Sequence, residues 1–289
     1  MPARGTLASV LDVSTLEAPL GTLLKDWRRR RRMSQLDLAL EAGVSARHLS
    51  FLETGRSKPS REMVLHLSEQ LEVPLRDRNQ LLLAAGFAPA YAERGIDEPE
   101  MTPVRAALDR ILKGHEPYPA VVVDRWWDLA AANAGIALFT AEVAPHLLEP
   151  PVNALRVTLH PDGMAPRIDN LPEWRAHLLD RVRRQIAVTH DERLAELYAE
   201  VAGYPGGEAA LPAHEPSIAV PLRVNVQSAE LSFLSTIATF GTAVDITLAE
   251  LAIEAFFPAD EATSAYLLNA TSPSSSSRSG APSPSNRTA

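Results

Sequence analysis

Residues 33–60, MSQLDLALEAGVSARHLSFLETGRSKPS, place several helix boundaries close together. Ser34 begins an S-x-x-D pattern, which is typical of the N-terminus of a helix. Gly43 can end that helix, Ser45 can cap the next one, and Gly55 can end it in turn. The stretch therefore predicts two short helices joined by a tight turn.

This closely punctuated helical pattern extends over residues 19–87. Leu20, Leu24 and Trp27 have the spacing of one helix face ahead of the stretch, and two proline-opened helices follow it. We therefore expect an all-α domain of five short helices.

Two segments of unusual composition mark the boundaries in the rest of the chain. The segment FAPAYAERGIDEPEMTP is rich in proline and acid, and the chain ends in ATSPSSSSRSGAPSPSNRTA, which has almost nothing to bury. We expect a flexible N-terminus (1–18), a helical domain (19–87), a linker (88–103), a second domain (104–268) and a disordered Ser/Pro-rich tail (269–289).

Charge is distributed unevenly between these parts. The whole chain has a net charge of −8, yet Pro19 to Glu62 holds 10 basic and 5 acidic residues, including the run Arg28 to Arg32. A basic module on an acidic body indicates a polyanionic partner for that module. The alternative is a solvated helix face that binds nothing.

The turn EAGVS satisfies the physical needs of a helix-turn-helix motif. Gly43 permits the tight turn, and Ser45 caps the second helix, whose N-terminal end would enter a major groove. Arg47 and His48 are placed where base edges would lie. The stretch from Leu20 to Ser60 resembles the XRE (Cro/C1-type) helix-turn-helix family of regulators, which bind double-stranded operator DNA.

The XRE resemblance assigns roles to individual residues. It implies that Gln35 contacts phosphate, that Arg56 and Lys58 follow the DNA backbone, and that Arg28 forms a structural ion pair with Glu53. Ala46 departs from the glutamine that often occupies its position. The expected DNA-binding residues are Gln35, Ser45, Ala46, Arg47, His48, Ser50, Arg56 and Lys58.

The second domain has a mixed pattern, which predicts an α+β fold with an antiparallel sheet. YPAVVVDRWWDLAAAN indicates two short strands, and alternation followed by QSAE predicts a hairpin. Thr247 begins a T-x-x-E capping box, which predicts a final helix to about Phe257. The other expected elements are a strand at Leu155 to His160, one or two helices over Leu171 to Ala202 broken near Thr189, and a strand at Ile218 to Val226 with Pro221 at a sheet edge or a bulge.

Three stretches, including YPAVVVDRWWDLAAANAGIALF and LAIEAFFPAD, resemble the PAS-like ligand-binding domain of MmyB-like transcription regulators. The resemblance implies a cavity that holds a small apolar or fatty-acid-like molecule. Residues 188–213 are short and Gly-rich, and there the chain departs from the family. The candidate ligand residues are Trp126, Trp127, Asn133, Phe139, Trp174 and Phe233; most aromatic ones could equally be core, and Asn133 is favoured as a helix cap.

Several functional classes lack a signal in this sequence. The chain has no cysteine, no zinc-hydrolase histidine spacing, no G-x-S-x-G or G-x-G-x-x-G, no long apolar run and no signal peptide. We expect a cytoplasmic, homodimeric transcription regulator without a catalytic site, a metal or a cofactor other than its ligand. The alternative is a DNA-binding protein whose second domain serves only dimerisation or protein interaction.

Overall fold

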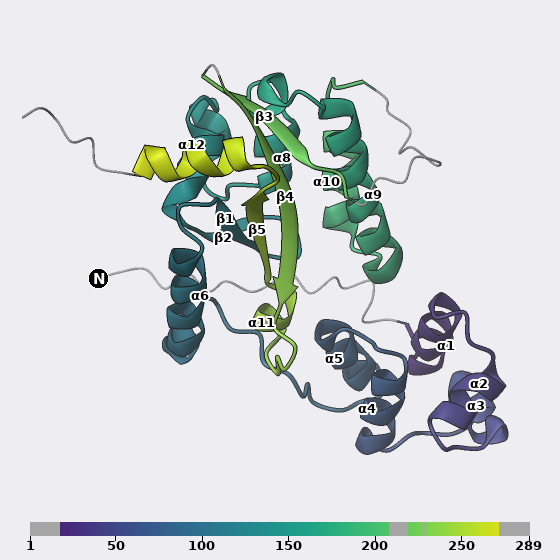
Figure 1. Ribbon diagram of the computed structural model, residues 1–289. Coiled ribbons are helices and arrows are strands. Elements are labelled where there is room, and N and C mark those ends of the chain that lie inside the picture. The colour runs from purple at the N-terminus through teal and green to yellow at the C-terminus, as the bar shows by residue number, and fades with distance from the viewer. Residues whose placement is uncertain (1–17, 208–218, 228, 272–289) are drawn as a thin grey trace, which may run out of the picture.

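The computed structural model describes residues 18–207, 219–227 and 229–271, which form a helical region followed by a sheet domain (Figure 1). The expected five-helix, all-α region and the α+β domain are both confirmed. The first region comprises α1 (Leu20–Arg30), α2 (Gln35–Glu41), α3 (Ala46–Glu53), α4 (Arg61–Gln70) and α5 (Leu75–Ala84).

Serine side chains fix where the short helices begin. Ser34 and Asp37 form a reciprocal capping box, and Ser45 accepts a hydrogen bond from the backbone N–H of His48 at 3.1 Å. Gly43 has φ +63°, a left-handed conformation that other residues adopt only with strain. The expected turn between α2 and α3 is therefore present, and its geometry follows from these residues.

The sheet domain contains five antiparallel strands in the order β2-β1-β5-β4-β3. Both the strand pair around Asp124 and the late hairpin are confirmed. The edge strand β3 begins directly after Pro221, which agrees with the expected edge position. The strands are β1 (Ala120–Val123), β2 (Leu129–Ala132), β3 (Leu222–Val226), β4 (Ala229–Thr239) and β5 (Ala252–Pro258).

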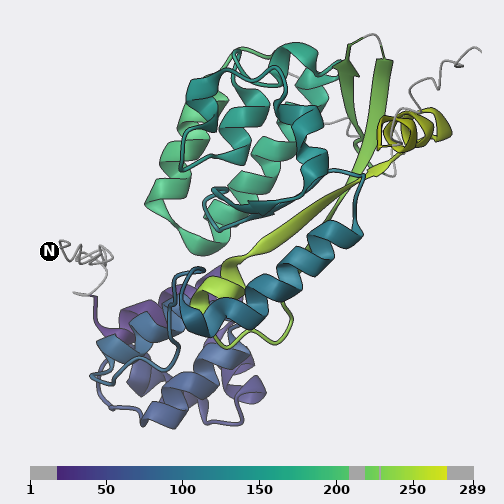
Figure 2. The same cartoon turned by 90° about the vertical axis from the view of Figure 1, so that its left-hand side faces the viewer.

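Helices cover both faces of this sheet (Figure 2). On one face, α8, α9 and α10 enclose the larger apolar core together with the strands. On the other face, α6 packs against β1 and β5. The helices of this domain are α6 (Thr102–Gly114), α7 (Ala137–Thr140), α8 (Ala154–Leu159), α9 (Leu171–Thr189), α10 (Glu192–Ala202), α11 (Ile246–Glu250) and α12 (Glu261–Thr271).

Two expected elements were wrong. The strand expected at Leu155 is the helix α8, because the side chain of Asn153 caps the backbone N–H groups of the first turn. The capping box at Thr247 is not used: Asp245 caps α11, which ends at Glu250, and the segment expected to continue as helix forms the central strand β5.

Other expectations fall partly outside the described residues. The strand expected from Ile218 starts at Leu222, and Ile218 itself is not described. The expected flexible N-terminus and Ser/Pro-rich tail lie outside the described residues except for Ala18 and 269–271, the last of which belong to α12. Within the part that the structure describes, no helix is long and apolar enough to cross a membrane.

Candidate nucleic-acid interface and apolar pocket

The arginine block serves more than one purpose. Arg28 is buried and makes a bidentate ion pair with Glu53, with Nε–Oε1 at 2.6 Å and Nη2–Oε2 at 2.9 Å, and it also donates to the carbonyl of Met33. Arg31 donates to the carbonyls of Leu71 and Glu72, at the end of α4, at 2.8 and 2.7 Å. Arg31 is half-buried and is therefore not a freely solvated member of the run. Arg29, Arg30 and Arg32 are exposed.

Gln35 lies beside the ion pair and not free in solvent. Its Nε2 donates to Glu53 Oε2 at 2.8 Å, so that the carboxylate joins α1, α2 and α3. Burial alone would raise the pKa of Glu53, but the hydrogen bonds from Arg28 and Gln35 bring that pKa below its ordinary value. To contact a phosphate, Gln35 must either use its second N–H or break this bond.

The N-terminal half of α3 presents the other expected DNA-facing residues. Arg47 is exposed, and its guanidinium carbon lies 5.3 Å from the centre of the Phe51 ring, a cation–π contact. Ser45 is exposed as well, whereas Ala46, His48 and Ser50 are half-buried. Arg56 and Lys58 are exposed in the loop that follows α3. In Figure 1, α2 and α3 lie at the end of the molecule away from the sheet, where a duplex could approach.

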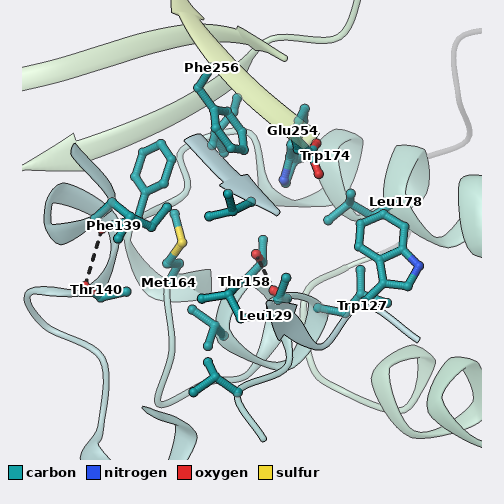
Figure 3. Close-up of a pocket in the computed structure, with 17 residues that line it drawn as sticks. Trp127, Leu129, Phe139, Thr140, Thr158, Met164, Trp174, Leu178, Glu254 and Phe256 are labelled. Carbon is teal, nitrogen blue, oxygen red and sulfur yellow. Dashed lines mark hydrogen bonds between the residues drawn. The ribbon is translucent and has the colours of Figure 1, made fainter. Parts of the chain in front are cut away.

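An apolar pocket lies between the sheet and helices α7 to α9 (Figure 3). Its cavity volume is about 70 Å³. Trp127, Phe139 and Trp174, three of the expected ligand residues, line it. The rest of the wall is mainly aliphatic and includes Leu129, Val157, Met164, Leu178 and Phe256.

The other three candidate ligand residues do not line this pocket. Trp126 donates through Nε1 to Asp191 at 3.0 Å, outside the pocket. Phe233 packs behind the wall, edge-on to Phe139 with ring centres 5.4 Å apart. Asn133 neither caps a helix with its side chain, as had been favoured, nor reaches the pocket. Its buried amide bonds the backbone of Ala120, Leu112 and Tyr118 and so fixes the start of β1.

Glu254 is a pocket residue that the sequence analysis did not identify. It lies on β5, is 4% exposed and lines a mainly apolar wall. Arg181 Nη1 lies 3.3 Å from both of its carboxylate oxygens, while burial raises the pKa of Glu254. Strand alternation would have marked this position as inward-facing, had the segment been interpreted as a strand.

A network of charged residues joins the helical region to the sheet domain. Arg76 of α5 binds Glu250 of α11, with Nη2–Oε2 at 2.9 Å, and also binds Glu93. Arg125, in the turn between β1 and β2, binds both Glu250 at 2.8 Å and Asp191 at 2.7 Å. The same turn carries Trp127 into the pocket, so the pocket wall and the domain contact share one short segment.

One surface cluster could hold a metal ion. Ligand atoms of His146, His160 and Asp162 lie within 4.8 Å of one another, although the two histidines are well separated in sequence. His146 and Asp162 are exposed. Their spacing matches none of the sequence motifs considered above.

Comparisons with known proteins agree with both regions. A family profile described as "MmyB-like transcription regulator ligand binding domain" matches residues 104–269, and one described as "Helix-turn-helix" matches residues 24–77. RghRB, an uncharacterized HTH-type transcriptional regulator of Bacillus subtilis (strain 168), is 28% identical over 116 residues, which cover 39% of this chain and 81% of the relative. The crystal structure of the clp gene regulator ClgR from Corynebacterium glutamicum matches at 27% identity, covering 35% of this chain and 95% of that one, with a TM-score of 0.22.

The helix-turn-helix region and the pocketed sheet domain together define a DNA-binding transcriptional regulator that carries a ligand-binding domain. The match over residues 104–269 spans more than half of the chain. The protein therefore belongs to the family of transcription regulators with an MmyB-like ligand-binding domain.

Proposed function

We propose that this regulator binds a small apolar molecule in the pocket of the sheet domain, and that binding changes its affinity for an operator. The observation that carries this proposal is the largely aliphatic wall around Trp127, Phe139 and Trp174. Concave apolar pockets with a few polar groups are typical of small-molecule sites.

The size of the cavity limits what it can hold as it stands. Its volume of about 70 Å³ is smaller than the roughly 150 Å³ of a cavity that accepts benzene. A short apolar group fits without change, whereas a long acyl chain requires the wall helices to move apart. Each buried CH₂ would contribute about 0.8 kcal/mol toward such an opening.

The domain contact offers a route from the pocket to the DNA-binding helices. Trp127 lines the pocket, and Arg125 in the same turn holds Glu250, which in turn holds Arg76 on α5. A ligand that displaces Trp127 would disturb this contact, and thereby favour one arrangement of the domains over another. A ligand alters DNA affinity only if it binds two such arrangements unequally.

On the DNA side, we propose that Ser45, Ala46, Arg47, His48 and Ser50 approach base edges and that Gln35, Arg56 and Lys58 approach phosphates. We further propose that the protein acts in the cytoplasm as a homodimer, because two half-sites supply affinity and spacing that one small helical domain lacks.

The test of ligand binding is a thermal-shift screen of the full-length protein with apolar compounds, preceded by native mass spectrometry of the purified material. Leu178→Phe would fill part of the pocket, whereas Leu179→Phe makes the same change at a neighbour outside its wall. We expect a ligand to raise the melting temperature of the wild type and of Leu179→Phe, but to have much less effect on Leu178→Phe. Equal shifts in melting temperature in all three proteins would mean that the ligand binds outside this pocket.

A second candidate function is dimerisation alone. Leu234 and Phe257 pair across β4 and β5 and are 39% and 42% exposed, so the sheet presents apolar surface that a second copy could cover. If no apolar compound alters melting or DNA binding, while Leu234→Asp converts a dimer to a monomer in analytical ultracentrifugation, this reading becomes the better one.

A further inference from the structure

Two of the side chains that line the pocket, Trp174 and Glu254, carry polar atoms, and Figure 3 shows both on the same side of the cavity. Trp174 comes from α9 and Glu254 from β5. The hydroxyl protons of the two threonines in the wall are already used: Thr140 donates to the carbonyl of Ile136, and Thr158 donates to that of Ala154 at 2.7 Å. The unpaired donor and the charged acceptor in the wall are therefore Trp174 and Glu254.

The indole N–H of Trp174 has no hydrogen-bond partner within the part of the chain that the structure describes. The residue is 2% exposed, and Figure 3 shows its nitrogen on the edge that faces the pocket interior. A buried donor without an acceptor is unfavourable, and such groups are rare in folded proteins. A ligand acceptor at this point would relieve that cost.

Glu254 provides the complementary acceptor. Its carboxylate accepts from Arg181, which lies 3.3 Å from each oxygen, and from the side chain of Ser235. A carboxylate can accept about four hydrogen bonds, so one further donor can be accommodated. The pocket wall thus offers an unpaired donor at Trp174 and an acceptor at Glu254, while the rest of the wall is mainly apolar.

We propose that the ligand is an apolar alcohol, whose hydroxyl accepts a hydrogen bond from Trp174 Nε1–H and donates one to Glu254. This proposal rests on the proposed function, because it specifies the ligand of the same pocket. A hydroxyl group is a donor and an acceptor at once, which is what this pair of side chains requires.

Other head groups satisfy only half of the site. A carboxylate could accept from Trp174 but would place a second negative charge against Glu254. An ammonium group could donate to Glu254 but would leave the indole N–H unpaired and face the positive charge of Arg181. A methyl ether can accept but has no proton to donate. The site therefore ranks alcohols above the acid, amine and ether of the same chain length.

Isothermal titration calorimetry on the full-length protein tests this ranking. The probes are n-butanol and n-hexanol, each with its matched carboxylate, amine and methyl ether. We expect the alcohols to bind about tenfold more tightly than the ethers, the difference expected from a hydrogen bond to a charged acceptor. Binding of hexanoate more tightly than n-hexanol, or equal binding of alcohol and ether, would overturn the hydroxyl proposal while leaving the apolar pocket intact. If none of the eight compounds binds, the proposed function itself fails and takes the hydroxyl proposal with it.

Three variants identify the groups responsible. Trp174→Phe keeps an aromatic ring but removes the N–H, and Glu254→Met keeps similar bulk but removes the acceptor. Each change should weaken alcohol binding several-fold. Glu254→Met should also abolish the preference for the alcohol over the ether. Glu230→Met makes the same change at an exposed position of β4 outside the pocket and should leave binding unchanged. If both changed side chains keep the wild-type affinity and preference, or if Glu230→Met loses them equally, the head-group assignment is wrong. Circular dichroism confirms that each variant is folded, and either of the first two is sufficient for the test.

Discussion

At the scale of single residues, neighbouring arginines in one charged run have different physical roles. Arg28 is held by Glu53 inside the helical region, and Arg31 closes the end of α4. Only Arg29, Arg30 and Arg32 of the run are exposed enough to attract a polyanion freely. A run of like charges therefore overstates the charge that is available to DNA.

The first prediction concerns the Arg28–Glu53 pair. Arg28→Met should lower the free energy of unfolding by about 3–5 kcal/mol, because it leaves the Glu53 carboxylate buried without its cation. The double variant Arg28→Met/Glu53→Leu should lose less. Urea unfolding of the full-length protein, followed by circular dichroism, measures both changes. Small and equal losses in the two proteins would mean that water already screens the pair.

The second prediction separates sequence reading from general DNA attraction. Arg47→Ala should cost roughly 1–3 kcal/mol on a selected duplex and relax the preference at one base position. Lys58→Ala should weaken binding to selected and random duplexes about equally and should reduce the salt dependence. Fluorescence anisotropy at several salt concentrations distinguishes the two patterns. If Arg47→Ala weakens both duplexes equally, α3 is not the helix that reads bases.

At the scale of elements, α1 crosses the end of α3 at a glycine. A Cβ at Gly21 would lie 2.4 Å from the carbonyl oxygen of Glu53 and 2.7 Å from that of Leu52. Backbone atoms cannot move aside as a flexible side chain can. The crossing therefore depends on a glycine that no turn or cap requirement explains.

The third prediction follows from this contact. Gly21→Ala should destabilise the protein by about 1–3 kcal/mol through overpacking, even though alanine favours helices. Thr22→Ala, one residue later on the exposed side of α1, is the matched control and should have little effect. Thermal unfolding of both variants measures the difference. A gain in stability for Gly21→Ala would show that α1 can shift away from α3 at little cost.

Local signals predicted some elements well and misplaced others. The five short helices were predictable because serine caps and glycine stops act within a few residues, as at Ser34 and Gly43. The segment after Thr247 was not, because whether it forms a helix or a strand depends on its place at the centre of a sheet. That error concealed Glu254, whose inward position follows from strand alternation. Trp127, Phe139 and Trp174 were found by residue type alone, which could not exclude Trp126 and Phe233.

At the scale of the whole molecule, the charged contact between the two regions buries the carboxyl group of Asp77, which disfavours its ionised form. Burial raises the pKa of Asp77 on α5 to about 6, and the nearby Arg125 and Arg30 offset only part of this effect. The folded protein therefore binds this proton more tightly than the unfolded chain does. The contribution of Asp77 to stability increases as the pH falls from about 7 to about 4.

The fourth prediction tests this sign. Asp77→Asn should raise the free energy of unfolding at neutral pH by up to about 3 kcal/mol, and the gain should shrink as the pH falls through 6 toward 4. Asp109→Asn, at an exposed position on α6, is the control. Urea unfolding of the three proteins at several pH values gives the comparison. A gain for Asp77→Asn that does not depend on pH would mean that Asp77 does not titrate in this range.

In the proposed function, a ligand in the pocket changes the DNA affinity of the helical region through the ion pairs of Arg125, Glu250 and Arg76. Glu250→Gln weakens both ion pairs of this contact while leaving the pocket wall and α3 unchanged.

The most direct measurement is the dissociation constant of the full-length protein for a duplex selected from random sequence, with and without saturating n-hexanol. We predict a change of about fivefold or more in the wild type, which corresponds to the lower range of allosteric coupling, and a much smaller change in Glu250→Gln. An unchanged dissociation constant in the wild type, with calorimetry showing that n-hexanol is bound, would contradict this coupling between the pocket and DNA binding.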